Sequence, residues 1–195
     1  FHLTHKNELD YAYDINSLSL VIYHILKNTD FVKQHTVLEK YINSIKSNDA
    51  NIIKFSFQLA HLYEKYIQYR PSWISSWNNN QLLKLKNDEF KHQKWQKNLW
   101  NSIKTIVAKP DLVEIFEQII QKLKSIEIPE NHHLKNIHFF GINHLPPFYF
   151  NLLISLQNIE NINTYFYYQT PSIEYYADQN KTTSLLGSFA KIGKD

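Results

Sequence analysis

Apolar residues recur at helical spacing through the first two thirds of the chain. The clearest run alternates steps of three and four residues between positions 51 and 69, which puts its apolar side chains on one face of a helix. Asn48 or Asp49 can cap the start of this helix. Pro71 ends it, because the residue before a proline avoids helical backbone angles.

The same periodicity predicts four more helices. They cover residues 15–26 and 30–45 before the clearest run, and residues 95–106 and 110–128 after it. Residues 78–91 are rich in Asn and Lys and are expected to form a polar loop. The expected core face of the last helix consists of Leu112, Ile115, Phe116, Ile119, Ile120 and Leu123.

The pattern changes after His133. Residues 137–140 are a short apolar run typical of a buried strand, and Gly141 breaks it. Pro147 fits the first turn of a helix, which needs no N–H donor there, and a second apolar run follows at 162–168. Strand, helix and strand within about thirty residues predict a parallel βαβ unit.

This change of pattern predicts an α/β fold class with two domains. We expect a helical subdomain at 1–130 and part of an α/β core at 131–195. In parallel sheets, functional groups gather at the carboxyl ends of the strands. The residues at that end of the first strand are Gly141, Ile142, Asn143 and His144. A nucleotide-hydrolysing enzyme would place an Asp or Glu there to hold magnesium, and this strand end offers neither.

Composition narrows the class of protein. Hydrophobic residues make up 43% of the 195 residues, cysteine is absent, and the formal net charge is +3. The chain can therefore bury a core, has no thiolate metal site, and permits contact with nucleic acid without requiring it. No apolar run is long enough to span a bilayer. Because the chain starts at Phe1 and contains no Met, we expect it to be a piece of a longer protein.

A metal site and a catalytic site both find little support in the sequence. His132, His133, His138 and His144 are close in sequence but lack the fixed spacing of converging zinc ligands, so we expect no metal site. No Ser-His-Asp order or nucleophile elbow stands out, and no spacing of carboxylates favours a hydrolase. We therefore expect no catalytic residues in this chain.

The end of the chain, residues 185–195, resembles a phosphate-binding loop without fitting it. Five residues separate Gly187 from Gly193, where the motif has four. Asp195 stands where Ser or Thr must hold magnesium, and its carboxylate would repel phosphate.

Arg70, Trp73 and Trp77 form the most informative group of side chains. In one interpretation, the arginine holds a phosphate while indole faces stack on the bases of a single strand. In the other, both tryptophans are core residues and Arg70 caps the carboxyl end of the preceding helix. The residues alone favour the second interpretation, because buried aromatic anchors are commoner than stacking platforms.

Four segments, taken together and in order, resemble one family. They are QLAHLYEKYIQYRPSWISSW (58–77), WQKNLW (95–100), FFGINHLPPFYFNLLISL (139–156) and LLGSFAKIGKD (185–195). They resemble the RecC family, the gamma subunits of exodeoxyribonuclease V, also called the RecBCD complex. The YRPxW and FGIxxLPP blocks carry most of the specificity. The chain departs from the expected pattern at Phe189, where we expect Trp, and at Lys194, where we expect Arg.

The resemblance implies a fold and a role. RecC proteins are built like superfamily 1 helicases, with a P-loop-NTPase-like core whose ATP site is degenerate. The chain would then be a helical insertion followed by part of that core. It would belong to a non-motor subunit that guides single-stranded DNA, helps to split the duplex and scans for the Chi sequence during repair of double-strand breaks.

The resemblance also implies partners, cofactors and site residues. The partners would be RecB-like and RecD-like subunits in a heterotrimer, DNA ends and single-stranded DNA, with no membrane and a cytoplasmic location. ATP and magnesium would be bound only by the partner subunits. Arg70, with Trp73 in the same block, would line the channel of the scanned strand, and Asp14 would fall near the family's acidic cluster.

Two other kinds of function stay open. The apolar helices could form a scaffold that docks the helicase subunits without touching DNA, in which case partner binding would be insensitive to salt. The chain could also hold an enzyme site that the sequence does not reveal, which a strongly shifted titratable group in a cleft would indicate.

Overall fold

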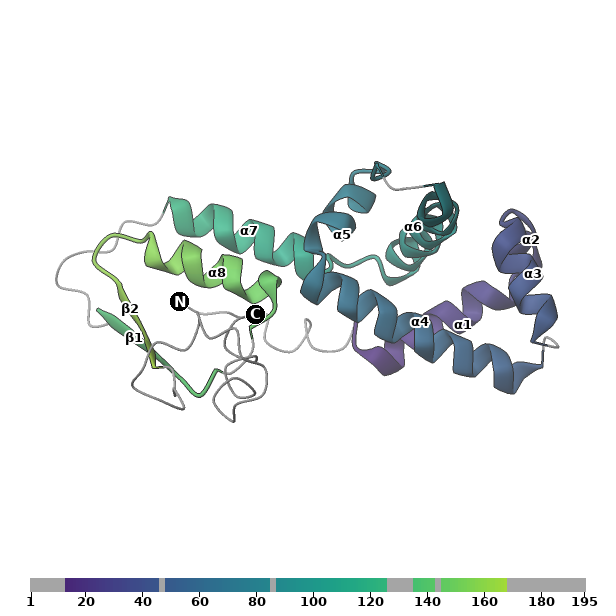
Figure 1. Ribbon diagram of the computed structural model, residues 1–195, viewed down its shortest axis with the longest axis horizontal. Helices are drawn as coiled ribbons and strands as arrows, with labels where there is room; N and C mark the ends of the chain where they lie inside the picture. Colours follow the sequence, from purple (N-terminus) through teal and green to yellow (C-terminus); the bar gives the residue numbers. More distant parts are fainter. Residues whose placement is uncertain (1–12, 46–47, 85–86, 126–134, 143–144, 168–195) are drawn as a thin grey trace, which may run out of the picture. The chain divides into compact units, whose positions relative to one another are not determined.

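The computed structural model describes residues 13–45, 48–84, 87–125, 135–142 and 145–167 (Figure 1). By its contacts the chain divides into two compact units, Phe1–Ile119 and Ile120–Asp195. This division falls inside a helix, whereas the sequence pattern changes near residue 130, and the domain boundary at 130 stays a prediction. None of the described helices is both long enough and apolar enough to cross a membrane.

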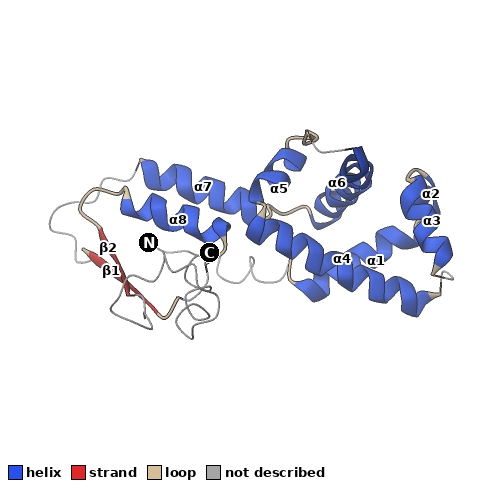
Figure 2. Ribbon diagram, viewed as in Figure 1, coloured by secondary structure: helices blue, strands red, loops and turns tan. Residues whose placement is uncertain are grey.

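The first unit is helical (Figure 2). Its helices are α1 (Ile15–Lys27), α2 (Thr29–Lys33), α3 (Thr36–Ser44), α4 (Asp49–Tyr69), α5 (Pro71–Asn78) and α6 (Asn87–Val107), followed by the start of α7 (Leu112–Lys124). The predicted cap of α4 is confirmed, because the Asn48 side chain accepts a hydrogen bond from the Asn51 amide at 2.8 Å. Pro71 ends α4 as predicted and also occupies the first turn of α5.

The core of this unit lies where α1, α4, α5 and α6 meet. Helices α1 and α4 run antiparallel, and the ion pair between Lys27 and Asp49 at 2.7 Å joins the end of one to the start of the other. Tyr63, Trp77 and Trp100 are fully buried, and the Tyr63 ring lies 5.3 Å from Trp100 and 6.4 Å from Trp77. Burial of three large rings supplies much of the apolar area that this unit removes from water.

Two predicted helices differ from those in the structure. The single helix predicted at 30–45 is two, α2 and α3, because Asn28 caps α2 and the chain leaves helical geometry at His35. The helix predicted from 95 begins at Asn87, so the polar loop is shorter than expected. Lys, Glu and Gln are good helix formers even where no apolar period marks them.

Helix α7 is also less buried than predicted. Among the described residues of α7, only Val113 is buried, at 2% exposure. Asp111, which immediately precedes the helix, is fully buried. The predicted apolar face from Leu112 to Leu123 is half-buried. The buried contacts of this helix are therefore concentrated at its first turn.

The second unit contains the predicted parallel βαβ arrangement. Strand β1 (Asn136–Phe140), helix α8 (Pro147–Gln157) and strand β2 (Asn163–Tyr167) follow one another, and β1 pairs with β2 in parallel. Pro147 occupies the first turn of α8, as predicted. Gly141 follows β1 with φ +67°, a backbone angle that favours glycine. The described chain is thus mostly helical with a two-stranded parallel sheet.

The rings of the two strands stack in register. His138 lies beside Tyr165 with ring centroids 4.8 Å apart, and Phe140 lies beside Tyr167 at 4.3 Å. Phe140 is 68% exposed and Tyr167 is 48% exposed. The strands were predicted to be buried, so this exposure differs from the expectation. A parallel sheet is normally covered on both faces.

Candidate nucleic-acid interface

Arg70 forms the corner between α4 and α5. Its backbone N–H donates to the Tyr66 carbonyl at 2.8 Å and closes the last turn of α4. Its carbonyl accepts from the Trp73 amide at 2.9 Å and opens α5. With φ −138° and ψ 51° the residue belongs to neither helix, and Pro71 fixes the direction of the chain after it. The backbone of Arg70 therefore has a structural role, as the capping interpretation predicts.

The side chain of Arg70, unlike its backbone, makes no capping hydrogen bond to α5 and lies at the surface. It is exposed, and its guanidinium carbon lies 4.3 Å from the centre of the Trp73 ring. Trp73 is half-buried and packs against Tyr66 at 5.4 Å between ring centroids. A guanidinium over an indole gains about 0.5–1 kcal/mol at an exposed site. The structure therefore brings Arg70 and Trp73 together with the cation facing solvent.

The two tryptophans differ in burial, and the core interpretation is confirmed for Trp77. Trp77 is fully buried and packs edge-on against Tyr66 at 5.7 Å, so it is a core residue. Trp73 lies one turn earlier, between this core and the surface. The sequence alone could not separate them, because both rings lie within one turn of each other on a short helix.

Tyr66 connects the Arg70–Trp73 pair to α6. Its hydroxyl donates to the Gln96 side-chain oxygen at 3.1 Å, and the Tyr63 hydroxyl donates to the Gln96 carbonyl at 2.7 Å. Burial raises the pKa of Tyr66 above its ordinary value, although the Arg70 charge acts in the opposite direction. The phenol therefore remains a neutral donor. Tyr66 and Gln96 were missed as supporting residues, and the only sequence signal was that Tyr66 lies four residues before Arg70.

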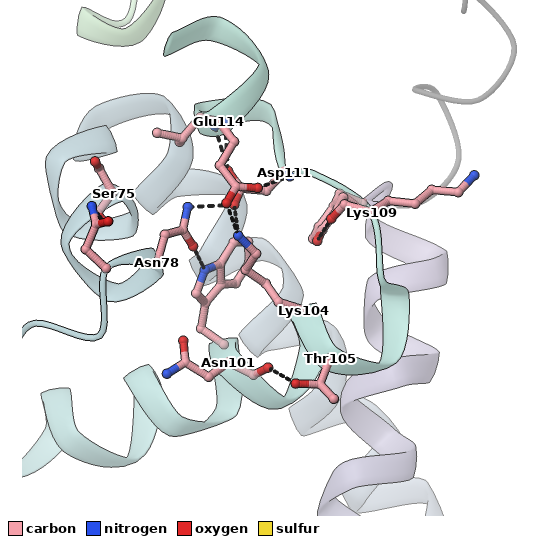
Figure 3. Close-up of polar contacts among 12 residues, drawn as sticks. Ser75, Asn78, Asn101, Lys104, Thr105, Lys109, Asp111 and Glu114 are labelled. Carbon is pink, nitrogen blue, oxygen red and sulfur yellow. Dashed lines mark hydrogen bonds and ion pairs between the residues drawn. The ribbon is translucent and has the colours of Figure 1, made fainter. Parts of the chain in front are cut away.

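A buried polar network holds the other end of α5 (Figure 3). The Asn78 amide donates to the Asp111 carboxylate at 2.8 Å and accepts from the Trp100 indole at 2.9 Å. Lys104 lies 3.1 Å from the same carboxylate and also pairs with Glu114. Asp111 in turn accepts from two amides in the first turn of α7, so it is a helix cap as well as an ion-pair partner. Because α5 is fixed at both ends, the Arg70–Trp73 pair stands on a rigid support.

Asp14 has a local structural role. Its carboxylate accepts from the Asn16 and Ser17 amides at 2.9 and 3.2 Å, which caps α1. Hydrogen bonding from Ser17 lowers the pKa of this carboxyl below its ordinary value. Within the described part of the chain, the hydrogen bonds of Asp14 are all to α1, and none joins it to Arg70 or Trp73. The predicted DNA contact at Asp14 stays a prediction.

The predicted strand end and histidine cluster lie partly outside the described residues. Gly141 and Ile142 are described, but Asn143, His144, His132 and His133 are not, and neither are residues 185–195. His138 is described and stacks on Tyr165 of the neighbouring strand. Within the described ranges, no three His, Asp or Glu side chains converge in a way that could hold a metal ion.

Arg70 also stands out in the composition. It is the single arginine in the sequence, and the other basic residues among the 21 are lysines. Arginine differs from lysine in its planar guanidinium, which binds phosphate through two hydrogen bonds and stacks on aromatic rings. The position that stacks on Trp73 is thus the one position at which the chain uses that chemistry.

The chain is similar to the proteins of one family. Residues 2–192 match the family model described as RecC, N-terminal domain. The RecBCD enzyme subunit RecC of Buchnera aphidicola subsp. Acyrthosiphon pisum is 26% identical over 155 residues, covering 78% of this chain and 14% of that protein. The RecBCD enzyme subunit RecC of Escherichia coli K12 is 24% identical over 159 residues, covering 79% of this chain and 13% of that protein. The chain thus spans about one seventh of the length of these relatives.

Proposed function

The chain belongs to the RecC family, and from that premise we propose that it is part of the non-motor subunit of a RecBCD-type complex. The complex would act in the cytoplasm on double-strand breaks, with RecB-like and RecD-like subunits as partners. Within it, this region would guide a single strand of DNA after the duplex has been split. Scanning of the 3′-ended strand for Chi is the finer part of the same proposal.

The observation that carries the proposal is the exposed Arg70 guanidinium stacked on Trp73. An arginine held in this way keeps its N–H groups directed at solvent, where a phosphate accepts two of them. The stacked plane also restricts the side chain before DNA arrives, so less conformational entropy is lost on binding. Trp73 thus contributes mainly by positioning the guanidinium, and its own ring face is shared with Arg70.

We propose further that this region does not hydrolyse ATP. The described part of the β1 end, Gly141 and Ile142, contains no carboxylate for magnesium. The parallel βαβ unit agrees with the helicase-like core that the family resemblance implies, and we propose that the ATP site of this core is degenerate. ATP and magnesium would then be bound by the partner subunits alone.

The experiment compares the purified complex with variants at Arg70. We expect Arg70→Ala to weaken retention of the single strand, or the response to Chi, by about 1–3 kcal/mol, which is typical of one specific contact. Binding to forked DNA at two salt concentrations measures the first effect, and cleavage on Chi-containing substrate measures the second. Lys33→Ala is the matched control, because it removes an exposed positive charge from α2.

The outcomes separate the proposed role from the scaffold. A complex that assembles normally but holds the fork less tightly with Arg70→Ala supports a strand-guiding subunit. If Arg70→Ala behaves as Lys33→Ala does, while the partners still assemble in a salt-insensitive way, the region is a docking scaffold. ATP hydrolysis by the isolated subunit that is lost on mutating residues 141–144 would refute the absence of an ATP site.

A further inference from the structure

A groove lies between α3 and α4, near the start of α4. It has a volume of about 380 Å³ and lies within the first unit. This volume is in the range of pockets that bind small planar molecules. The groove shares α4 with the Arg70 corner but lies near the start of this helix, whereas Arg70 follows its end.

An aromatic pair forms part of the groove. Tyr41 from α3 packs against Phe55 from α4 with ring centroids 4.6 Å apart and planes inclined at 48°. The tyrosine is 42% exposed and Phe55 is half-buried beneath it. An aromatic ring that packs against a neighbour and is also exposed to solvent can stack on a nucleobase, and any of the bases can take part.

The polar side chains of the groove suit a ligand that carries a negative charge and also has hydrogen-bonding groups, as a nucleotide does. Lys54 is exposed, and no carboxylate is among the residues that line the groove. Asp49, at the start of the same helix, is already paired with Lys27 at 2.7 Å. Asn51 donates one of its two amide hydrogens to the Ile45 carbonyl at 2.6 Å. Lys54 can therefore meet a phosphate while the amides of the groove meet the edge of a base.

The groove shares one flank of α4 with the Arg70 corner. Phe55, Gln58, Tyr66 and Tyr69 follow helical spacing on this flank, and Arg70 comes directly after it. At about 1.5 Å per residue, Lys54 and Arg70 are separated by about 24 Å along the helix axis. A single strand whose bases stay stacked as in a duplex, at about 3.4 Å per nucleotide, covers that distance in about seven nucleotides.

We propose that the α3–α4 groove is a second contact for single-stranded DNA, in which Tyr41 stacks on a base and Lys54 binds a phosphate. The inference rests on the proposed function, because it takes the strand to be the one that Arg70 contacts. It adds a site at the other end of α4 and predicts that binding depends on the length of the strand.

The test uses the full-length subunit in its complex, bound to forked DNA with single-stranded tails of increasing length. Tyr41→Ala should weaken binding of long tails about tenfold, as expected for loss of one stacked base, and should leave the shortest tails unaffected. Lys54→Ala should reduce the slope of log affinity against log salt concentration by about one. Phe57→Ala and Lys33→Ala are matched controls, because both side chains are exposed and lie outside the groove.

A second readout is direct. Ultraviolet cross-linking of a tail that carries bromodeoxyuridine, followed by peptide mapping, should identify the peptide around Tyr41. Groove variants that bind every tail as the controls do, with no cross-link to this peptide, would overturn the inference. If Arg70→Ala still weakens binding in that case, the proposed function stands alone; if it does not, both fail. Loss of subunit assembly with Tyr41→Ala, in place of loss of DNA binding, would make the groove a protein contact and also overturn the inference.

Discussion

Aromatic rings contact one another in both units of the chain, but their exposure to water differs. In the helical unit, Tyr63, Trp77 and Trp100 are fully buried. In the second unit, Phe140 and Tyr167 stack at 4.3 Å and yet remain 68% and 48% exposed. Ring contact is therefore similar in the two units, whereas the apolar area removed from water is not. Because that area dominates the free energy of folding, only the first set of rings is expected to determine stability.

The comparison also separates two ways of presenting a side chain. Arg70 and Trp73 stand on a buried support that includes Tyr66, so their positions are fixed by the helical core. Among the described residues, the rings of β1 and β2 stack on each other across a two-stranded sheet, and such a sheet has little stability of its own. A precise contact with DNA is thus expected from the helical unit, where the surrounding structure restricts the positions of the contacting side chains.

The largest effect should come from removing a ring from the helical core. Trp100→Ala leaves a cavity beside Tyr63 and an unpaired Asn78 oxygen, and should lower the local free energy of unfolding by about 3–5 kcal/mol. Hydrogen exchange of the amides of α4 and α6 in the full-length chain measures this change.

The matched change in the sheet should have a small effect. Phe140→Ala removes one exposed cross-strand ring and should cost less than about 1 kcal/mol. If it destabilised the amides of β1 and β2 as strongly as Trp100→Ala destabilises those of α4, the difference drawn between the two units would be wrong.

The loss expected at Asp111 is smaller than that of Trp100→Ala and larger than that of Phe140→Ala. Asp111→Ala leaves the positive charge of Lys104, which is largely buried, without this partner and removes the cap of α7. Loss of one member of a buried ion pair costs about 3 kcal/mol, and Glu114 remains as a second partner for Lys104. The exchange rates of α5 and the first turn of α7 should rise together. Asp111→Asn keeps the cap and should recover part of the loss; equal losses for both variants would contradict the double role.

The smallest effect is expected from the pH dependence of His35 in the helical unit. Burial of His35, with a further contribution from the positive charge of Lys94, lowers the pKa of its imidazole below 6.5. The unfolded state then binds more protons than the folded state just below pH 6.5, so stability falls as the pH falls through this value towards the folded pKa. The difference in stability between the protein and His35→Asn, followed from pH 8 to pH 5, isolates this residue. If the difference in stability between the two proteins does not depend on pH, the lowered pKa of His35 does not contribute to the stability of the fold.

Much of the helical unit follows from the sequence for a physical reason. The period of three and four between positions 51 and 69, the cap at Asn48 and the stop at Pro71 are local signals, and the structure confirms all three. The parallel βαβ unit was predicted for the same reason, because Gly141 and Pro147 are local signals for the end of a strand and the start of a helix. The break at His35 was missed because the apolar period continues across it.

The site depends more on tertiary structure. Arg70 and Trp73 were singled out because they are neighbours in the chain, and the structure brings them into contact at 4.3 Å. Their support by Tyr66 and Gln96 could not be predicted, because those residues lie on different helices and meet only in the folded unit. The same holds for Asn78 and Asp111, whose pairing fixes α5 across a separation of 33 residues.

The measurement that tests the central claim most directly is the affinity of the complex for a single-stranded tail when Arg70 is replaced by lysine. Arg70→Lys keeps the charge but loses the planar group that stacks on Trp73 and binds phosphate through two hydrogen bonds. We predict several-fold weaker binding with an unchanged dependence on salt, whereas Arg70→Ala should also lower the salt slope by about one. Binding by Arg70→Lys that equals that of the unsubstituted protein would contradict the claim that the stacked guanidinium is a specific contact for the strand.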